Sequence, residues 1–91
     1  MNRMKIVFSE KAENELDSAD QSLRKLFLKH SEKIVSMPPK RHMKFGLPFN
    51  VKEVTKQARI IYQIEGSEGI CYVLHCFKTH KEYERWYKSF K

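Results

Sequence analysis

Two stretches of the sequence hold the side chains best suited to chemistry on a phosphate. Arg59 lies in an apolar, β-branched segment, and its planar guanidinium can donate two parallel hydrogen bonds to an anion. His80 and Lys81 follow the last apolar segment, where an imidazole can exchange protons near neutral pH. Lys78, just before them, can hold a phosphate. These residues predict proton transfer and charge stabilisation at a polyanion.

The charge of the chain is strongly positive and unevenly distributed. Its 91 residues have a formal net charge of +7 and a sequence pI of about 9.5. Acidic residues dominate the first twenty positions, whereas residues 24–59 and 78–91 are rich in lysine and arginine. Such a chain attracts phosphates or acidic proteins before any specific contact forms. A solvated basic surface is the plain alternative, but the segregation favours RNA as the ligand.

The densest group of cations follows two consecutive prolines, in a stretch whose glycine and proline content is typical of a loop. Basic loops contact nucleic-acid phosphates without reading the base sequence. We therefore predict that this loop and the strand after it bind RNA, with a merely solvated loop as the alternative. The residues concerned are Lys40, Arg41, Lys44, Lys52 and Lys56.

Length and composition predict one small domain that spans residues 1–91. The chain is 41% apolar and 32% charged, with few glycines and prolines, so it should fold around a single core. It has no apolar run of membrane-spanning length, and its first residues lack the apolar stretch of a signal peptide. The expected location is the cytoplasm, without a membrane partner.

Neither the cysteines nor the histidines form a metal-binding pattern. Cys71 and Cys76 lie in a predicted strand at odd spacing, which places them on opposite faces about 16 Å apart and excludes a disulfide between them. No paired Cys-x-x-Cys or His-x-x-x-His pattern is present. We expect no metal or other cofactor. His30 and His75 lie on apolar faces and are expected to be core or sheet residues.

The apolar pattern predicts an α+β domain. An N-terminal strand at residues 5–8 is followed by a helix that Ser9 caps, and then, after a break at residues 17–20, by a second helix that Asp20 or Ser22 caps. This two-helix hairpin should pack on a mostly antiparallel, twisted sheet of about four strands. The remaining strands are expected at residues 51–55, 58–64 and 70–77, and a C-terminal helix at residues 79–90.

The order of these elements resembles the RelE/ParE toxin superfamily. The resemblance covers almost the whole chain, from the Val7-Phe8-Ser9 opening through the proline pair to Arg59-Ile60-Ile61-Tyr62, which looks like the family's Tyr-Arg-Ile-hydrophobic-Tyr signature. Ala58 stands where the family usually has an aromatic residue, and the C-terminal segment lacks the commoner arginine ahead of the final tyrosine.

The resemblance implies the toxin of a toxin-antitoxin pair, with a cognate antitoxin protein as its partner. For the RelE branch it implies a ribosome-dependent endoribonuclease that cuts mRNA without a metal and so inhibits translation. The ParE branch instead inhibits DNA gyrase. A gyrase inhibitor, a decayed toxin that only binds its antitoxin, and a general RNA-binding module are the alternatives.

Metal-free RNA cleavage needs a base for the 2′-hydroxyl, cations for the developing charge and an acid for the leaving oxygen. The family has its functional arginine at the position of Arg59, for which an ion pair with Glu53 is the structural alternative. His80 is the first choice for the acid or base, and Lys81 is a second candidate. Which of them donates and which accepts is left open.

The C-terminal segment adds aromatic candidates. Tyr83 and Tyr87 are one helical turn apart, so either could stack on a base or orient a phosphate, as a C-terminal tyrosine does in RelE-like enzymes. Core packing is the alternative for one of them. Trp86 and Phe90 are expected to anchor the helix to the sheet or to cover an apolar groove, with base stacking as the alternative.

Overall fold

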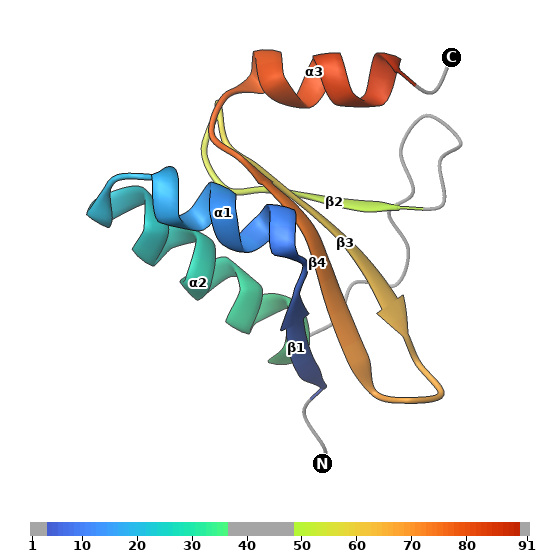
Figure 1. Cartoon of the computed structure of the whole chain (residues 1–91). Coiled ribbons are helices and arrows are strands. Elements are labelled where there is room, and N and C mark those ends of the chain that lie inside the picture. Colours follow the sequence, from blue (N-terminus) through green and yellow to red (C-terminus); the bar gives the residue numbers. More distant parts are fainter. Residues whose placement is uncertain (1–3, 37–48, 90–91) are drawn as a thin grey trace.

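The computed structural model describes residues 4–36 and 49–89, which form an α+β fold with a single four-stranded sheet (Figure 1). The strand order is β1-β4-β3-β2, in which only the β1–β4 pair is parallel. This confirms the predicted two-helix hairpin, the mostly antiparallel sheet and the C-terminal helix. The elements are β1 (Lys5–Phe8), α1 (Glu10–Ser18), α2 (Gln21–Ser36), β2 (Asn50–Glu53), β3 (Arg59–Glu65), β4 (Ile70–Phe77) and α3 (His80–Lys88).

Side-chain caps set the bounds of the helical hairpin. Ser9 Oγ accepts a hydrogen bond from the backbone N–H of Ala12 at 3.0 Å and starts α1. Asp20 Oδ1 accepts one from Leu23 N–H at 2.8 Å, which makes Asp20 the cap of α2. Arg24 closes α1 by donating to three of its last carbonyl oxygens, where a cation also stabilises the helix dipole. Those carbonyls belong to Leu16, Asp17 and Ala19.

The second and third strands are shifted by one or two residues from the predicted positions because a hydroxyl shapes the turn between them. Thr55 Oγ1 accepts hydrogen bonds from the N–H groups of Gln57 and Ala58, at 3.1 and 2.9 Å. The chain therefore turns where the pattern of β-branched residues predicted that β2 would continue. The next turn, from β3 to β4, includes Gly69 at φ +66°, a conformation that glycine adopts without strain.

The sheet separates two apolar clusters. The larger lies between the sheet and the α1–α2 hairpin, and is built around residues such as Phe27, Ile60 and Tyr62, all at most 1% exposed. The smaller lies on the other face, where Ile61 and Phe77 pack against Tyr83 of α3. In Figure 1, α3 crosses the end of the sheet that is remote from the β3–β4 turn. The sheet therefore holds α3 apart from the other two helices.

The prediction that Cys71 and Cys76 face opposite sides of the sheet is wrong. The pairing of β3 with β4 shifts between Ile61 and Tyr62, so that Leu74 has no direct partner in β3. This β-bulge changes the alternation of side chains by one position. Both cysteines consequently pack into the larger core, where they are at most 1% exposed and free of any disulfide.

The buried thiols predict a loss of stability in alkali. Burial raises the pKa of Cys71 to about 11; burial, with the Glu15 carboxylate, raises that of Cys76 to about 12. The thiols of the unfolded chain ionise near pH 9, so their stabilising effect is complete below pH 9 and is lost as the pH rises through the folded values. Urea unfolding should show a free energy that falls between pH 9 and pH 10.

The matched control for this prediction is the double variant Cys71→Ala, Cys76→Ala. Its free energy of unfolding should be lower at pH 8 because of the cavities, yet should decline less steeply above pH 9. The measurement stops at pH 10 because ionisation of Tyr62 would also destabilise the fold at higher pH. Burial raises the pKa of Tyr62 from 10.0 to about 12. Equal slopes for the two proteins would contradict the prediction.

Candidate active site

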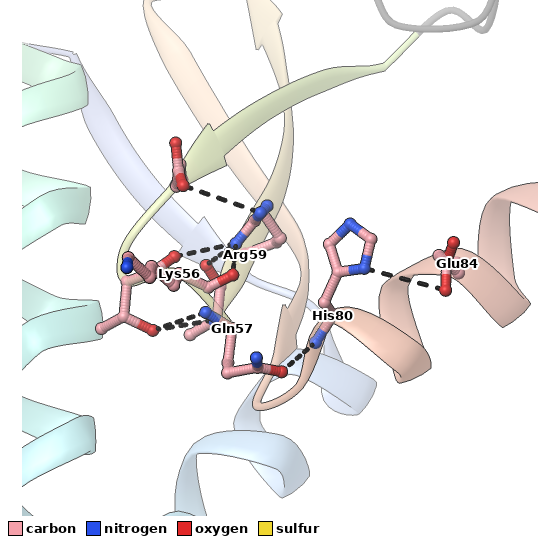
Figure 2. A network of polar contacts seen from close by, with 8 residues as sticks. Lys56, Gln57, Arg59, His80 and Glu84 are labelled. Carbon is pink, nitrogen blue, oxygen red and sulfur yellow. Dashed lines mark hydrogen bonds and ion pairs between the residues drawn. The ribbon is translucent and has the colours of Figure 1, made fainter.

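The turn between β2 and β3 meets the first residue of α3, which brings two basic segments together. The backbone N–H of His80 donates to Gln57 Oε1 at 3.2 Å, across 23 positions of sequence (Figure 2). Lys56 and Arg59 belong to the turn and to the start of β3, and Lys81 follows His80 on the exposed side of α3. We call this group the turn–helix site; it comprises Lys56, Arg59, Lys78, His80, Lys81 and Tyr83.

A capping box fixes the start of α3. Thr79 Oγ1 accepts from the N–H of Glu82 at 3.1 Å, and Glu82 Oε1 accepts from the N–H groups of Thr79 and Lys78 at 3.3 and 2.9 Å. The Lys78 backbone is therefore held in place, while its half-buried side chain borders a groove between α1 and α3. Local hydrogen bonds therefore fix the position of the backbone at His80.

The Arg59 guanidinium folds back onto the turn. Nη2 lies 3.7 Å from Glu53 Oε2, so the predicted structural alternative is present. Arg59 lies on the same face of the sheet as Ile61, and its side chain is only 13% exposed. Its charge lies 5.9 Å from the centre of the Tyr83 ring. Nη1 donates to three backbone carbonyls, those of Thr55, Lys56 and Ala58, at 2.8, 3.1 and 3.0 Å (Figure 2).

His80 is the accessible imidazole of the site. Its side chain is 42% exposed, and Nδ1 lies 3.7 Å from Glu84 Oε1, one helical turn further on (Figure 2). Its ring meets the ring of Tyr83 edge to face, with centroids 5.7 Å apart. An imidazole that is backed by a carboxylate and open to solvent can take up or release a proton.

Tyr83 is a core residue. It is 5% exposed and packs against Phe77 and Tyr87, with ring centroids 6.5 and 5.0 Å away. Burial and Tyr87 raise the pKa of Tyr83, and the Arg59 charge only partly opposes them, so the phenol stays protonated. Core packing, the predicted alternative for one of the two tyrosines, therefore describes Tyr83, while Tyr87 is half-buried above it.

Of the other predicted RNA-binding lysines and arginines, Lys52 is described by the structure, and it is not brought to this site. Lys52 pairs with Ile60, whose side chain lies in the larger core, so it belongs to the face of the sheet opposite Arg59. There burial, together with Lys52, Lys33 and Lys29, lowers the pKa of His30. Lys40, Arg41 and Lys44, with Phe90, lie outside the described residues. Trp86 packs against the smaller core, which confirms its predicted anchoring role.

The sequence did not predict the pairing of Glu15 with His75. Glu15 Oε1 accepts from the backbone N–H of Cys76 at 2.7 Å, and Oε2 lies 3.1 Å from His75 Nδ1. The His75 ring stacks on Phe77 with centroids 4.6 Å apart and planes 13° from parallel. The pair joins residues 60 positions apart. The one available signal was an acidic residue beside Leu16, on the buried side of a helix.

Comparisons with known proteins identify the fold. No protein-family model matches the sequence, and no curated protein matches it. Among solved structures, the isolated Escherichia coli RelE toxin is 16% identical, has a TM-score of 0.72, and is matched over 97% of this chain and 99% of its own. The chain has the RelE-like toxin fold.

Two further structures show the same fold. A chain of the Mycobacterium tuberculosis RelBE2 toxin-antitoxin complex is 10% identical, with a TM-score of 0.72 over 84% of this chain and 98% of that one. The Staphylococcus aureus YoeB dimer gives 15% identity and a TM-score of 0.69 over 84% and 97%. The RelE-like fold is thus kept at sequence identities too low for a sequence match.

The side chains of the candidate site that can take part in a reaction are lysines, an arginine and a histidine. No cluster of three or more metal-ligating side chains occurs in residues 4–36 and 49–89. Over the same residues, no helix has the length and apolar character that crossing a bilayer requires. The turn–helix site can supply positive charge to a phosphate and one accessible imidazole for proton transfer.

Proposed function

We propose that this protein is the toxin of a toxin-antitoxin pair and acts in the cytoplasm as a ribosome-dependent mRNA endoribonuclease. The observation that carries the proposal is the turn–helix site, where a RelE-like fold joins two distant basic segments around an accessible imidazole. The similar structures support it, since they are described as toxins or toxin-antitoxin complexes. The proposed partners are an antitoxin protein, mRNA and the ribosome.

The proposed reaction is attack of a ribose 2′-hydroxyl on the adjacent phosphorus, which breaks the bond to the 5′-oxygen. His80 can accept or donate a proton, and the Glu84 carboxylate lies 3.7 Å from its Nδ1. Lys56 and Lys81 are exposed on the two segments of the site and can hold the phosphate. The Arg59 charge, fixed by the turn, adds to the positive potential around them.

A second candidate function is favoured by the geometry of Arg59. Its Nη1 already donates to three carbonyls and its Nη2 faces Glu53, which suits a residue that supports the turn. A chain whose arginine is structural could be a binder, either a ParE-like inhibitor of DNA gyrase or a decayed toxin that holds only its antitoxin. Such a protein would arrest growth without cutting RNA, or would not arrest growth at all.

The deciding experiment expresses wild type, His80→Gln and Ser67→Ala in cells and maps new 5′ ends on translated messages. Ser67 is the control because it is exposed on the β3–β4 turn, far from the turn–helix site. We expect growth arrest with codon-positioned cuts from wild type and Ser67→Ala. We expect His80→Gln to cut between about 10² and 10⁴ times more slowly, as the loss of a general acid or base predicts.

Two outcomes would contradict the ribonuclease proposal. Growth arrest with intact messages and an accumulation of cleaved DNA–gyrase complexes would identify the gyrase inhibitor. An absence of both growth arrest and cuts, with antitoxin binding retained, would identify the decayed toxin.

A further inference from the structure

A cleft on the other side of Trp86 from the α1–α3 groove holds a second imidazole. It is bordered by α1, β3, β4 and α3, and its lining includes Lys11, Phe49, Gln63, His75 and Trp86. Phe49 and Trp86 form an aromatic wall, with ring centroids 5.4 Å apart. The Trp86 ring also lies 5.6 Å from the His75 ring. The cleft thus offers an aromatic surface, an amide, a cation and an imidazole.

The edge of β4 explains why Glu15 lies beside this imidazole. β1 pairs with β4 only as far as Val73, so the following backbone groups of β4 need other partners. Ser9 Oγ donates to the carbonyl of Leu74 at 2.8 Å, and Glu15 Oε1 accepts from the N–H of Cys76 at 2.7 Å. The carboxylate is therefore fixed by the backbone, and its second oxygen is left for His75.

The Glu15 carboxylate defines which nitrogen of His75 carries a proton. An ionised carboxylate only accepts hydrogen bonds, so Nδ1, 3.1 Å from Oε2, must be the donor. In the neutral imidazole the lone pair then lies on Nε2. Stacking on Phe77 holds the plane of the ring. A carboxylate that orients an imidazole in this way is the arrangement that prepares histidine to act as a general base.

We propose that this cleft is a second ribonucleotide subsite, in which His75, positioned by Glu15, accepts the 2′-hydroxyl proton of an RNA nucleotide stacked on Phe49 and Trp86. The inference rests on the proposed endoribonuclease function and assigns its base to His75 instead of His80, so that the turn–helix site binds a neighbouring part of the same RNA. Lys11, on the rim of the cleft, is the cation available to the phosphate. Glu15 is a positioning residue, since it acts through His75.

The proposed reaction transfers only protons and a phosphoryl bond, and it needs no cofactor. The 2′-oxygen gives its proton to His75 Nε2 and forms a bond to phosphorus, and the bond from phosphorus to the 5′-oxygen breaks. The products are a 2′,3′-cyclic phosphate and a 5′-oxygen that takes a proton from water. The imidazolium then returns its proton to the resulting hydroxide, which restores neutral His75.

The first test measures cleavage of mRNA on programmed ribosomes between pH 5 and pH 9. The proteins are wild type, His75→Gln, Glu15→Gln and, as a control on the far turn, Ser67→Ala. We expect His75→Gln to cleave between about 10² and 10⁴ times more slowly and to lose the rise of rate with pH. Glu15→Gln, whose amide oxygen can still accept from Cys76 N–H, should lose less activity.

The second test needs no cleavage, because Trp86 is the one tryptophan of the 91 residues. An imidazolium beside an indole quenches its fluorescence, so the free protein should show a fluorescence transition with pH that is absent in His75→Gln. Glu15→Gln, which removes the carboxylate that accepts from Nδ1, should alter that transition. The other charged groups around the cleft are Glu10 and Lys11 of α1, and Lys78, Glu82 and Arg85 line the groove behind Trp86.

The same fluorescence should report binding of an RNA trinucleotide in which one ribose, at the cleavage position, lacks its 2′-hydroxyl. Phe49→Leu should weaken that binding at least several-fold, since a base loses part of its stacking surface. Far-UV circular dichroism would show whether each variant is folded, and the fluorescence titration of Glu15→Gln tests the pair even if His75→Gln does not fold.

The outcomes separate the inference from the proposed function. If wild type cleaves and His75→Gln cleaves equally fast with the same pH profile, the inference is overturned and the endoribonuclease proposal stands. If wild type leaves RNA intact on ribosomes, the endoribonuclease proposal fails and the inference fails with it. A Trp86 titration that is unchanged in His75→Gln would also overturn the inference.

Discussion

Replacing Arg59 by alanine should lower the free energy of unfolding by about 1.5–3 kcal/mol, in addition to any effect on RNA. The guanidinium donates to three backbone carbonyls of the β2–β3 turn, and the side chain is only 13% exposed. Without it, those carbonyls lose a charged donor and Tyr83 loses the cation above its ring. Urea unfolding at pH 7 measures the loss directly.

Two matched variants separate the turn contacts from the charge. Arg59→Lys keeps the charge but cannot reproduce the planar fork, so it should lose most of the same stability. Glu53→Gln should cost less than about 1 kcal/mol, because Glu53 is 65% exposed and its pair with Arg59 is screened by water. If Arg59→Ala is as stable as wild type, the turn contacts are unimportant.

This prediction bears on any activity measurement. Because the Gln57–His80 hydrogen bond joins the same turn to α3, a disturbed turn would also move the accessible imidazole. A loss of cleavage in Arg59→Ala therefore indicates a phosphate contact only if it exceeds the loss in a variant that disturbs the turn alone. Thr55→Ala is that variant, since it removes the hydroxyl that caps Gln57 and Ala58.

Replacing Phe27 by alanine should cost about 3–5 kcal/mol, the largest stability effect that we expect from a single core substitution. Phe27 is 0% exposed and lies in the cluster between α2 and the sheet. A domain of this size has a total stability of about 5–15 kcal/mol, so the variant should unfold at much lower urea concentrations or fail to fold at 37 °C. Chemical denaturation followed by circular dichroism measures it.

The next residue on the same helix is the control. Leu28 is 44% exposed, so Leu28→Ala should change stability by about 0.5 kcal/mol or less. Phe27→Leu, which keeps most of the buried volume, should fall between the two. Similar costs for Phe27→Ala and Leu28→Ala would show that the α1–α2 hairpin does not pack as described.

Local patterns were sufficient for most of the fold. Asp20 or Ser22 was predicted to cap α2, and Asp20 does so; this signal is local, because a cap acts on backbone groups within three residues. The C-terminal helix was predicted from Thr79, which is the cap of α3 in the structure. Strand β4 was predicted with its observed bounds, Ile70–Phe77, since an apolar run after a glycine turn favours a strand. The RelE-like element order followed from these local signals.

Interactions between residues that are distant in the sequence could not be predicted from the spacing of apolar residues. The bulge at Leu74 depends on how β3 and β4 pair, and it reversed the predicted facing of Cys76. The placement of Lys52 away from Arg59 depends on the strand register. Alternation within one strand cannot reveal either, because register is set by both partners and by the core that they cover.

The sequence by itself determined the fold class, the order of the elements, the positive charge and the identity of the candidate Arg59, His80 and Lys81. Only the tertiary structure decided that the Arg59 guanidinium turns back onto backbone carbonyls, and that a carboxylate 60 residues earlier lies against His75. The physical reason is that charge and helical or strand period are local properties of a chain. A hydrogen bond between separate elements exists only once packing has brought their atoms together.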